Sequence, residues 1–346
     1  MTESRLSLAI KALSRSQPLD ADLIEGAFQT LLSGEAEPVQ IGAFMMGLAV
    51  RGETGAELVA GARVLRSNAR TITLEGDILD TCGTGGLPWT SLNTSTASAI
   101  LVAACGGTVA KHGNRSVPPK TGSADVLEAL GVELDLTEVR FRDCIREAGV
   151  GFLFARSHHS AMRHVGPARQ TLGIRTIFNL LGPLSNPASA THQILGVNEA
   201  RWLEPMATAL RGLGTKRAWV VHGPDTEMGG IDEVSIAGPT QVIEVSNGDL
   251  TRFELVPNDA GLDTAPLSAL RGGHVDENAL AIRELLEGRE GPFRDAVLLN
   301  ASAGLFVLGR VEDLSAGVQQ AATALDSGAA LETLSTLVSA SNGKLA

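Results

Sequence analysis

Basic and hydrogen-bonding side chains crowd one short stretch of the chain, residues 109–125, which reads VAKHGNRSVPPKTGSAD. Lys111 offers a point charge for phosphate, and Asn114 and Ser123 offer hydrogen bonds. An apolar strand end precedes these residues, and a helical pattern follows them. For a single basic loop the alternative is a solvated surface turn, so a second feature has to decide between the two interpretations.

Glycines and small polar side chains form a second such stretch, residues 80–97, which reads DTCGTGGLPWTSLNTSTA. Gly83, Gly85 and Gly86 let backbone N–H groups approach an anion closely, and the helix predicted from about residue 94 adds unpaired donors. The stretch has neither a Walker GK[ST] nor a GxGxxG fingerprint. A plain Gly-rich connector is the alternative. The side chains that can bond phosphate oxygens, or waters on a metal, are Asn93, Ser95 and Thr96.

Two further segments carry candidate chemistry. Residues 229–235, GGIDEVS, place Asp232 beside Glu233, a pair that suits Mg²⁺ when it faces a polyphosphate and is otherwise simply solvated. Residues 155–187 are dense in arginine and histidine, and one arginine there is expected to clamp a carboxylate. Composition does not say which arginine. The pair His158–His159 lacks a Cys or carboxylate at ligand spacing, so a metal site there is not favoured.

The elements that must position these residues fall into two regions. Helical patterns fill the first 70 residues, with a capping box at Thr54 and Glu57, and predict a small helical domain over residues 1–72. From about residue 78, short apolar runs alternate with helical stretches, which predicts a mostly parallel sheet covered by helices on both faces. This large α/β domain is predicted to span residues 73–346, with a β-ribbon over 233–257 and helices from about 276 to the end.

The positions of the two polar loops in this alternation connect them. Both leave strands of the same parallel sheet, so both should emerge at the same edge. Two phosphate-suited loops at one edge predict a substrate with two separated phosphate groups. This argument favours binding over a surface turn or a connector.

Composition excludes several classes of protein. The chain has 346 residues, 44% of them hydrophobic, and a formal net charge of −11, which argues against general nucleic-acid binding. No signal peptide or membrane span is predicted. Cys82, Cys105 and Cys144 are too few and too widely spaced for a disulfide framework or a zinc site, so we expect reduced side chains and a cytoplasmic location.

Taken in order, the motifs GTGG…N-x-ST, KHGNR…GSAD, HHSAM…R…LGIRTIFNLLGPLSNP and IDE resemble those of the anthranilate phosphoribosyltransferase family. The resemblance covers nearly the whole chain. It implies a homodimer whose subunit has a small helical domain, joined in space by about residues 165–190, and a large α/β domain with a cleft between them. It also implies Mg²⁺-dependent transfer of the phosphoribosyl group of phosphoribosyl pyrophosphate to anthranilate, with release of pyrophosphate, in tryptophan biosynthesis.

The resemblance assigns roles to matching positions. The residues implied to bind phosphoribosyl pyrophosphate are Gly83, Gly86, Leu87, Ser91, Asn93, Thr94, Ser95, Thr96, Lys111, His112, Gly113, Asn114, Arg115, Pro119 and Ser123. The residues implied to bind anthranilate are Gly83, Asn114, Arg169 and Pro183, and His112 is implied to lie beside the path by which anthranilate enters. The residues implied to hold Mg²⁺ are Ser95, Asp232 and Glu233. No residue is assigned as a catalytic base, and His112 is at most a weak proton acceptor.

The chain departs from the family pattern at three places. Leu87-Pro88 stand where the family usually has Asp-Gly, and Pro118-Pro119 stand where it usually has two small hydroxyl residues. Ser160 replaces a proline after the His pair. Because proline stiffens a loop, we expect the two phosphate loops to be pre-ordered.

The implied chemistry suits these residue types. Departure of pyrophosphate leaves an oxocarbenium-like ribose, so charge stabilisation and positioning matter more than a strong base. One alternative is an enzyme of the same fold with another acceptor, such as a pyrimidine nucleoside phosphorylase. The other is a non-catalytic paralogue that binds nucleic acid.

Overall fold

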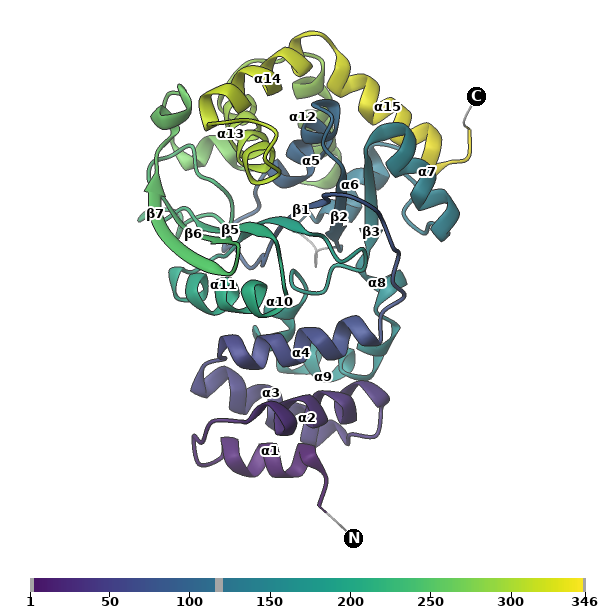
Figure 1. Cartoon of the computed structure of the whole chain (residues 1–346), viewed down its shortest axis with the longest axis vertical. Helices are drawn as coiled ribbons and strands as arrows, with labels where there is room; N and C mark the ends of the chain where they lie inside the picture. Colours follow the sequence, from purple (N-terminus) through teal and green to yellow (C-terminus); the bar gives the residue numbers. More distant parts are fainter. Residues whose placement is uncertain (1–2, 116–120, 345–346) are drawn as a thin grey trace.

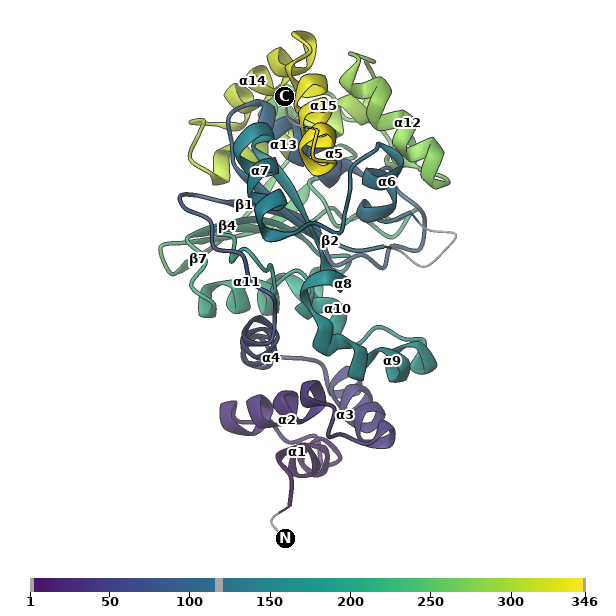
Figure 2. The same ribbon diagram turned by 90° about the vertical axis from the view of Figure 1, so that its right-hand side faces the viewer.

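The computed structural model describes residues 3–115 and 121–344. Its N-terminal part consists of four helices, and Figures 1 and 2 show them at one end of an elongated molecule. The capping box predicted at the fourth helix is present: Thr54 accepts from the Glu57 N–H, and the Glu57 carboxylate accepts from the Thr54 N–H. The helical character of this region is therefore confirmed. The four helices are α1 (Arg5–Leu13), α2 (Ala21–Ser33), α3 (Pro38–Arg51) and α4 (Gly55–Ser67).

A seven-stranded sheet forms the centre of the rest of the molecule, in the order β3-β2-β1-β4-β5-β6-β7. The first five strands in this order pair in parallel, and β6 and β7 are added antiparallel at one edge. The predicted mostly parallel α/β sheet is confirmed. The strands are β1 (Leu79–Gly83), β2 (Val109–Gly113), β3 (Val150–Phe154), β4 (His192–Gly196), β5 (Arg217–His222), β6 (Thr240–Ser246) and β7 (Asp249–Leu255).

The ribbon predicted over residues 233–257 is wrong in its first segment. Only β6 and β7 pair as a ribbon. In the preceding segment, backbone N–H groups donate to side chains instead of to a neighbouring strand. The Val234 N–H donates to Asn300 Oδ1 at 3.0 Å, and the Ser235 N–H donates to Thr240 Oγ1 at 2.9 Å. Val234 and Ile236 are buried although no strand pairs with this segment. An alternating apolar pattern in the sequence does not distinguish this arrangement from a paired strand.

Helices cover both faces of the sheet (Figure 1). On one face α5 is enclosed by α13, α14 and α15, and α7 packs on α15; on the other face α11 packs on β5 and β6 and also on α4. The helices beyond the N-terminal four are α5 (Thr94–Ala104), α6 (Ser123–Ala129), α7 (Glu138–Ala148), α8 (Ala155–His158), α9 (Gly166–Leu172), α10 (Ile177–Leu181), α11 (Leu203–Gly212), α12 (Val275–Leu286), α13 (Pro292–Val307), α14 (Leu314–Asp326) and α15 (Ala329–Ser341). Short 3₁₀ helices occupy Ser160–His164, Ala200–Trp202, Pro257–Ala260 and Leu267–Leu270.

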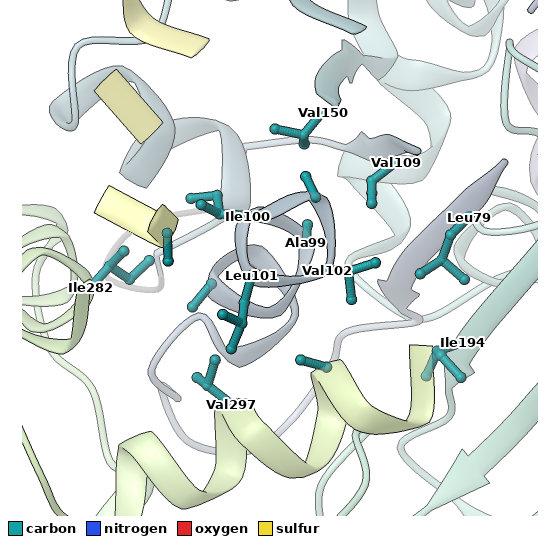
Figure 3. Packing of buried hydrophobic residues seen from close by; sticks show 14 of the residues in the cluster. Leu79, Ala99, Ile100, Leu101, Val102, Val109, Val150, Ile194, Ile282 and Val297 are labelled. Atoms are coloured by element: carbon teal, nitrogen blue, oxygen red, sulfur yellow. The ribbon is translucent and has the colours of Figure 1, made fainter. Parts of the chain in front are cut away.

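The larger apolar core surrounds α5, which is buried along most of its length. Figure 3 shows side chains of this helix among residues of the strands and of α12 and α13. The hydroxyl side chains of this helix are concentrated in its first turn, which lies at the carboxyl end of β1. Ser98 is further along the helix, and its hydroxyl donates to the Val297 carbonyl in the core at 3.3 Å. The core thus fixes the position of the first candidate loop.

A second apolar cluster joins the N-terminal helices to the opposite face of the sheet. Phe28 of α2 packs edge-on against Phe44 and Phe178, with ring centroids 5.6 and 5.9 Å apart. Val165 and Ile177 belong to the same cluster. Residues between 165 and 181 therefore pack with the N-terminal helices, while the division of the chain at residue 72 stays a prediction.

Within the described residues, no helix is long and apolar enough to cross a membrane.

Candidate active site

The two polar loops predicted from the sequence meet at the carboxyl ends of β1 and β2. Together with the turn at Asp232 and Glu233, they line a cavity of about 290 Å³. The predicted residues that line it are Gly83, Gly86, Leu87, Ser91, Asn93, Ser95, Lys111, His112, Gly113, Asn114, Arg115, Ser123, Asp232 and Glu233. The argument from strand ends is therefore confirmed as far as the placement of these residues is concerned.

Other predicted residues lie elsewhere. Thr94 and Thr96 are buried in the first turn of α5 and do not line this cavity. Arg169 and Pro183 do not line this cavity. Pro119 lies outside the described residues.

Lys111 brings a buried positive charge to the floor of the cavity. Its ammonium donates to Ser95 Oγ at 3.2 Å and to the carbonyl of Thr81, and the residue is only 3% exposed. Burial lowers the pKa of Lys111, while nearby carboxylates, first among them Asp80, act in the opposite direction. A cation held in place by neutral oxygens retains attraction for an incoming anion.

Asp80 supports the second loop from below, a contact that sequence reasoning did not identify. It is fully buried in β1, and its Oδ1 accepts the His112 N–H at 3.0 Å, which ties the start of the second loop to the first strand. Burial raises the pKa of Asp80. A carboxylate inside a buried strand that leads into a predicted phosphate loop is the signal that would have found it.

Asp232 and Glu233 hold the Gly-rich loop from the opposite side. Asp232 Oδ2 accepts the Gly85 N–H at 2.8 Å, and Glu233 Oε1 accepts the Ser95 N–H at 3.0 Å. Burial and the neighbouring Asp232 raise the pKa of Glu233 to about 8. Two carboxylates this close in a buried turn repel each other, so a cation placed beside them would be strongly favoured.

The donor set at this turn fits a hard cation. Glu233 Oε2 is buried and has no hydrogen-bond partner in the described part of the chain. The described residues contain no cluster of three or more His, Cys, Asp or Glu side chains able to hold a metal. A cation here would take its other ligands from substrate oxygens and water, which is how Mg²⁺ is usually bound.

Asn278, on α12, is a second residue that the sequence did not identify. Its Nδ2 donates to Asn93 Oδ1 and to the Ser91 carbonyl, both at 2.9 Å. With its carbonyl oxygen engaged in this way, the Asn93 side chain is held at the cavity wall. The 185 residues that separate Asn93 from Asn278 leave no local signal of the contact.

Arg115 lies at the cavity but is engaged by carboxylates of α6. Its guanidinium bonds Asp125 at 3.0 Å and Glu128 at 2.8 Å, and these two contacts raise its pKa. A phosphate would have to compete with both carboxylates for this side chain.

Three histidines gather beneath the second loop. The His112 and His159 rings lie 5.2 Å apart between centroids, and both residues are buried. Burial lowers the pKa of His112 well below its usual value and that of His159 to about 4, with the neighbouring His158 acting in the same direction. A neutral imidazole with so low a pKa is a weak proton acceptor.

Known proteins match nearly the whole of this chain, including the segments that form the site. Residues 75–331 match the glycosyl transferase family, a/b domain, and residues 7–69 match the helical bundle domain of the same family. An anthranilate phosphoribosyltransferase of Hyphomonas neptunium is 64% identical over 98% of this chain and 98% of its own length. One from Parvibaculum lavamentivorans is 51% identical over 97% of each chain. The chain belongs to the anthranilate phosphoribosyltransferase family.

Solved structures of the anthranilate phosphoribosyltransferase family share the fold. The Thermus thermophilus protein superposes with a TM-score of 0.90 at 44% identity, covering 96% of this chain and 99% of its own. The Saccharomyces cerevisiae protein, in complex with phosphoribosyl pyrophosphate and Mg, superposes with a TM-score of 0.89 at 25% identity, covering 99% of each chain.

Two departures from the usual pattern of this family concern the phosphate loops. Leu87 is 7% exposed, lines the cavity and belongs to the large apolar core, so an apolar side chain forms the wall where the family usually has a carboxylate. Pro118 and Pro119 lie outside the described residues, so the expectation that they pre-order the second loop stays a prediction.

Two of the four predicted acceptor residues, Arg169 and Pro183, lie in the segment that packs with the helical bundle. Arg169, on α9, stacks its guanidinium over the Phe178 ring at 5.5 Å from the centroid, and burial lowers its pKa. Pro183 is buried, and its carbonyl accepts from Gln193 Nε2 at 2.7 Å. The role of Arg169 in anthranilate binding stays a prediction.

The buried histidines predict an acid-sensitive fold. Because the pKa of His159 falls to about 4 in the folded state, the unfolded chain binds more protons below about pH 6.5, and stability is lost as the pH falls from there toward 4. The loss from one such group is roughly 1.4 kcal/mol per pH unit. We expect His159→Leu to reduce the difference in urea midpoint between pH 7.5 and pH 5. An unchanged difference would contradict this account.

Proposed function

We infer that the protein transfers the phosphoribosyl group of phosphoribosyl pyrophosphate to the amine of anthranilate, with release of pyrophosphate, the second step from chorismate in tryptophan biosynthesis. The observation that carries this conclusion is the meeting of three features in one cavity. They are the Gly-rich loop at the start of α5, the buried Lys111 and the pair Asp232 and Glu233. Similarity to anthranilate phosphoribosyltransferases over nearly the whole chain supports the same activity.

We propose that the cavity residues divide between the two phosphate groups and a metal. The Gly-rich loop and the first turn of α5 present backbone donors suited to the pyrophosphate. Lys111 and Ser123 are proposed to bind the phosphoribosyl end. Asp232, Glu233 and Ser95 are proposed to hold Mg²⁺, which when bound supplies positive charge for the departing pyrophosphate.

The arrangement favours catalysis by positioning and charge. As the bond to pyrophosphate breaks, negative charge grows on the leaving group, and donors already fixed by the fold need no reorganisation to stabilise it. Positive charge grows on the ribose, and an attacking amine that is neutral near pH 7 needs no strong base. The low pKa of His112 agrees with this requirement, since its imidazole can accept a proton only weakly.

The conclusion is tested by following the loss of anthranilate fluorescence on addition of phosphoribosyl pyrophosphate and Mg²⁺. No turnover in this assay would overturn it. Turnover with another amine or with a pyrimidine nucleoside, but not with anthranilate, would instead favour an enzyme of the same fold with a different acceptor. Nothing in the described structure favours the nucleic-acid-binding alternative.

We expect Asp232→Asn combined with Glu233→Gln to remove most of the turnover. Both substitutions keep side-chain oxygens that can accept from Gly85 and Ser95 but remove the negative charges that a cation needs. The measurement is the rate as a function of Mg²⁺ concentration, with circular dichroism to check folding. Full activity of the folded double variant would contradict the metal assignment.

Arg169 is expected to bind the carboxylate of anthranilate. A charge-assisted contact is worth roughly 1.5–3 kcal/mol, so Arg169→Ala should raise the KM for anthranilate by about ten- to a hundredfold. The KM for phosphoribosyl pyrophosphate should change much less. Arg163→Ala, an exposed arginine in the same segment, serves as the control. Equal effects of Arg169→Ala on both substrates would indicate a structural role.

We propose that the protein is a homodimer that associates through α3. Val39, Met46 and Val50 are 77%, 40% and 79% exposed, and with Ala43 they form an apolar stripe along one side of this helix. An exposed stripe of this kind is typical of an interface. A cytoplasmic location is also proposed, in keeping with three free cysteines.

The stripe predicts a substitution that separates the subunits. Val50→Glu together with Met46→Glu should yield a monomer by light scattering, because two buried charges would oppose association. Leu280→Glu, at a residue 55% exposed on α12, should leave the mass unchanged. A dimer that persists in the double variant would place the interface elsewhere.

A further inference from the structure

Arg175 connects the acceptor-side segment to the Gly-rich loop, although it does not line the cavity. It lies between α9 and α10, after Gly173, which ends α9 in the left-handed conformation. Its Nη1 donates to the Gly85 carbonyl at 2.6 Å, across 90 residues of sequence. The Arg175 side chain thus joins the segment between α9 and α10 directly to the backbone of the proposed pyrophosphate loop.

The contact fixes the orientation of one peptide group. Gly85 and Gly86 both have positive φ, 63° and 86°, so this part of the loop has a conformation open to few other residues. The Gly85 N–H is held by Asp232, and the Gly85 carbonyl is held by Arg175. Both polar groups of Gly85 are therefore bound by side chains from outside the loop.

The planarity of the peptide then determines where the next donor points. In a trans peptide the carbonyl and the following N–H point in opposite directions. With the Gly85 carbonyl turned toward Arg175, the Gly86 N–H is turned away from it, and no described residue accepts that N–H. Gly86 lines the cavity, so this donor is left for an anion.

The surroundings of Arg175 agree with such a role. A side chain at residue 86 would overlap Nη1, so Gly86 is what allows the guanidinium to lie against the loop. Nη2 is buried without a hydrogen-bond partner in the described part of the chain. Burial lowers the pKa of Arg175, while Asp232 and Glu199 act in the opposite direction.

We propose that Arg175 is a positioning residue that holds the Gly85–Gly86 peptide in the orientation that binds pyrophosphate, and so links the loop to the segment that carries Arg169. The catalytic part of this inference rests on the proposed function. The structural part, the orientation of a loop in the free protein, does not.

The structural part is tested by hydrogen exchange on the ligand-free protein. Arg175→Met keeps most of the side-chain stem and removes the donors, so amides in peptides that cover residues 83–90 should exchange several-fold faster. Arg201→Met is the matched control, because Arg201 lies close enough to influence the charge of Arg175 but bonds Glu199 instead of the loop. Unchanged exchange in Arg175→Met would overturn the proposal.

The catalytic part is tested by a comparison of the two substrates. Loss of a charged hydrogen bond predicts that Arg175→Met raises the KM for phosphoribosyl pyrophosphate by about ten- to a hundredfold and leaves the KM for anthranilate within about twofold. Arg175→Lys, which keeps a charged donor, should recover part of both the affinity and the exchange protection.

The outcomes separate the two proposals. An inactive wild-type protein would overturn the proposed function and leave the exchange experiment to test the loop. An active wild-type protein whose Arg175→Met variant raises both KM values equally, with a matching loss of thermal stability, would show a merely structural residue and overturn the inference.

Discussion

The site depends on the close approach of Asp232 to the ends of β1 and β4. Gly83 and Gly196 are partners in the parallel register of these strands, and a Cβ on either would overlap Asp232. The missing side chains let the carboxylate reach the Gly85 N–H, while Glu233 reaches the Ser95 N–H. The loop, the start of α5 and the acidic turn are therefore one assembly, and any change in the turn would alter the shape of the anion site.

The charges of this assembly are buried close to one another. Lys111 is held by neutral oxygens, and Asp80 lies in the strand beside it. Burial raises the pKa of Asp232, and burial together with the neighbouring Asp232 raises the pKa of Glu233, so a cation beside the pair would favour its charged form. A protein with a formal net charge of −11 can nevertheless bind phosphate locally, because this cavity is lined by a buried lysine and by backbone donors of the Gly-rich loop.

The segment that carries Arg169, residues 165–181, contacts both the N-terminal helices and the Gly-rich loop. Through Val165, Ile177 and Phe178 it is packed into the cluster that contains the N-terminal helices. Through Arg175 it reaches the Gly-rich loop. The same segment therefore contacts the helical bundle, carries the residue proposed to bind the acceptor and holds the loop proposed to bind pyrophosphate.

The sequence by itself determined the classes of element, the mostly parallel sheet and the meeting of the two polar loops, because periodicity, turn residues and the geometry of parallel strands are local or general properties. The pair Asp232 and Glu233 was linked to the phosphate loops by the resemblance to the family, since by its chemistry alone it also suited a solvated turn. Only the tertiary structure decided which polar groups touch. Asp80, Asn278 and Arg175 reach the loops from distant positions. Residues 233–238 do not form a strand, and Val234 bonds the Asn300 side chain instead. Such contacts depend on how separate elements pack, and packing of distant segments leaves no periodic pattern in a single chain.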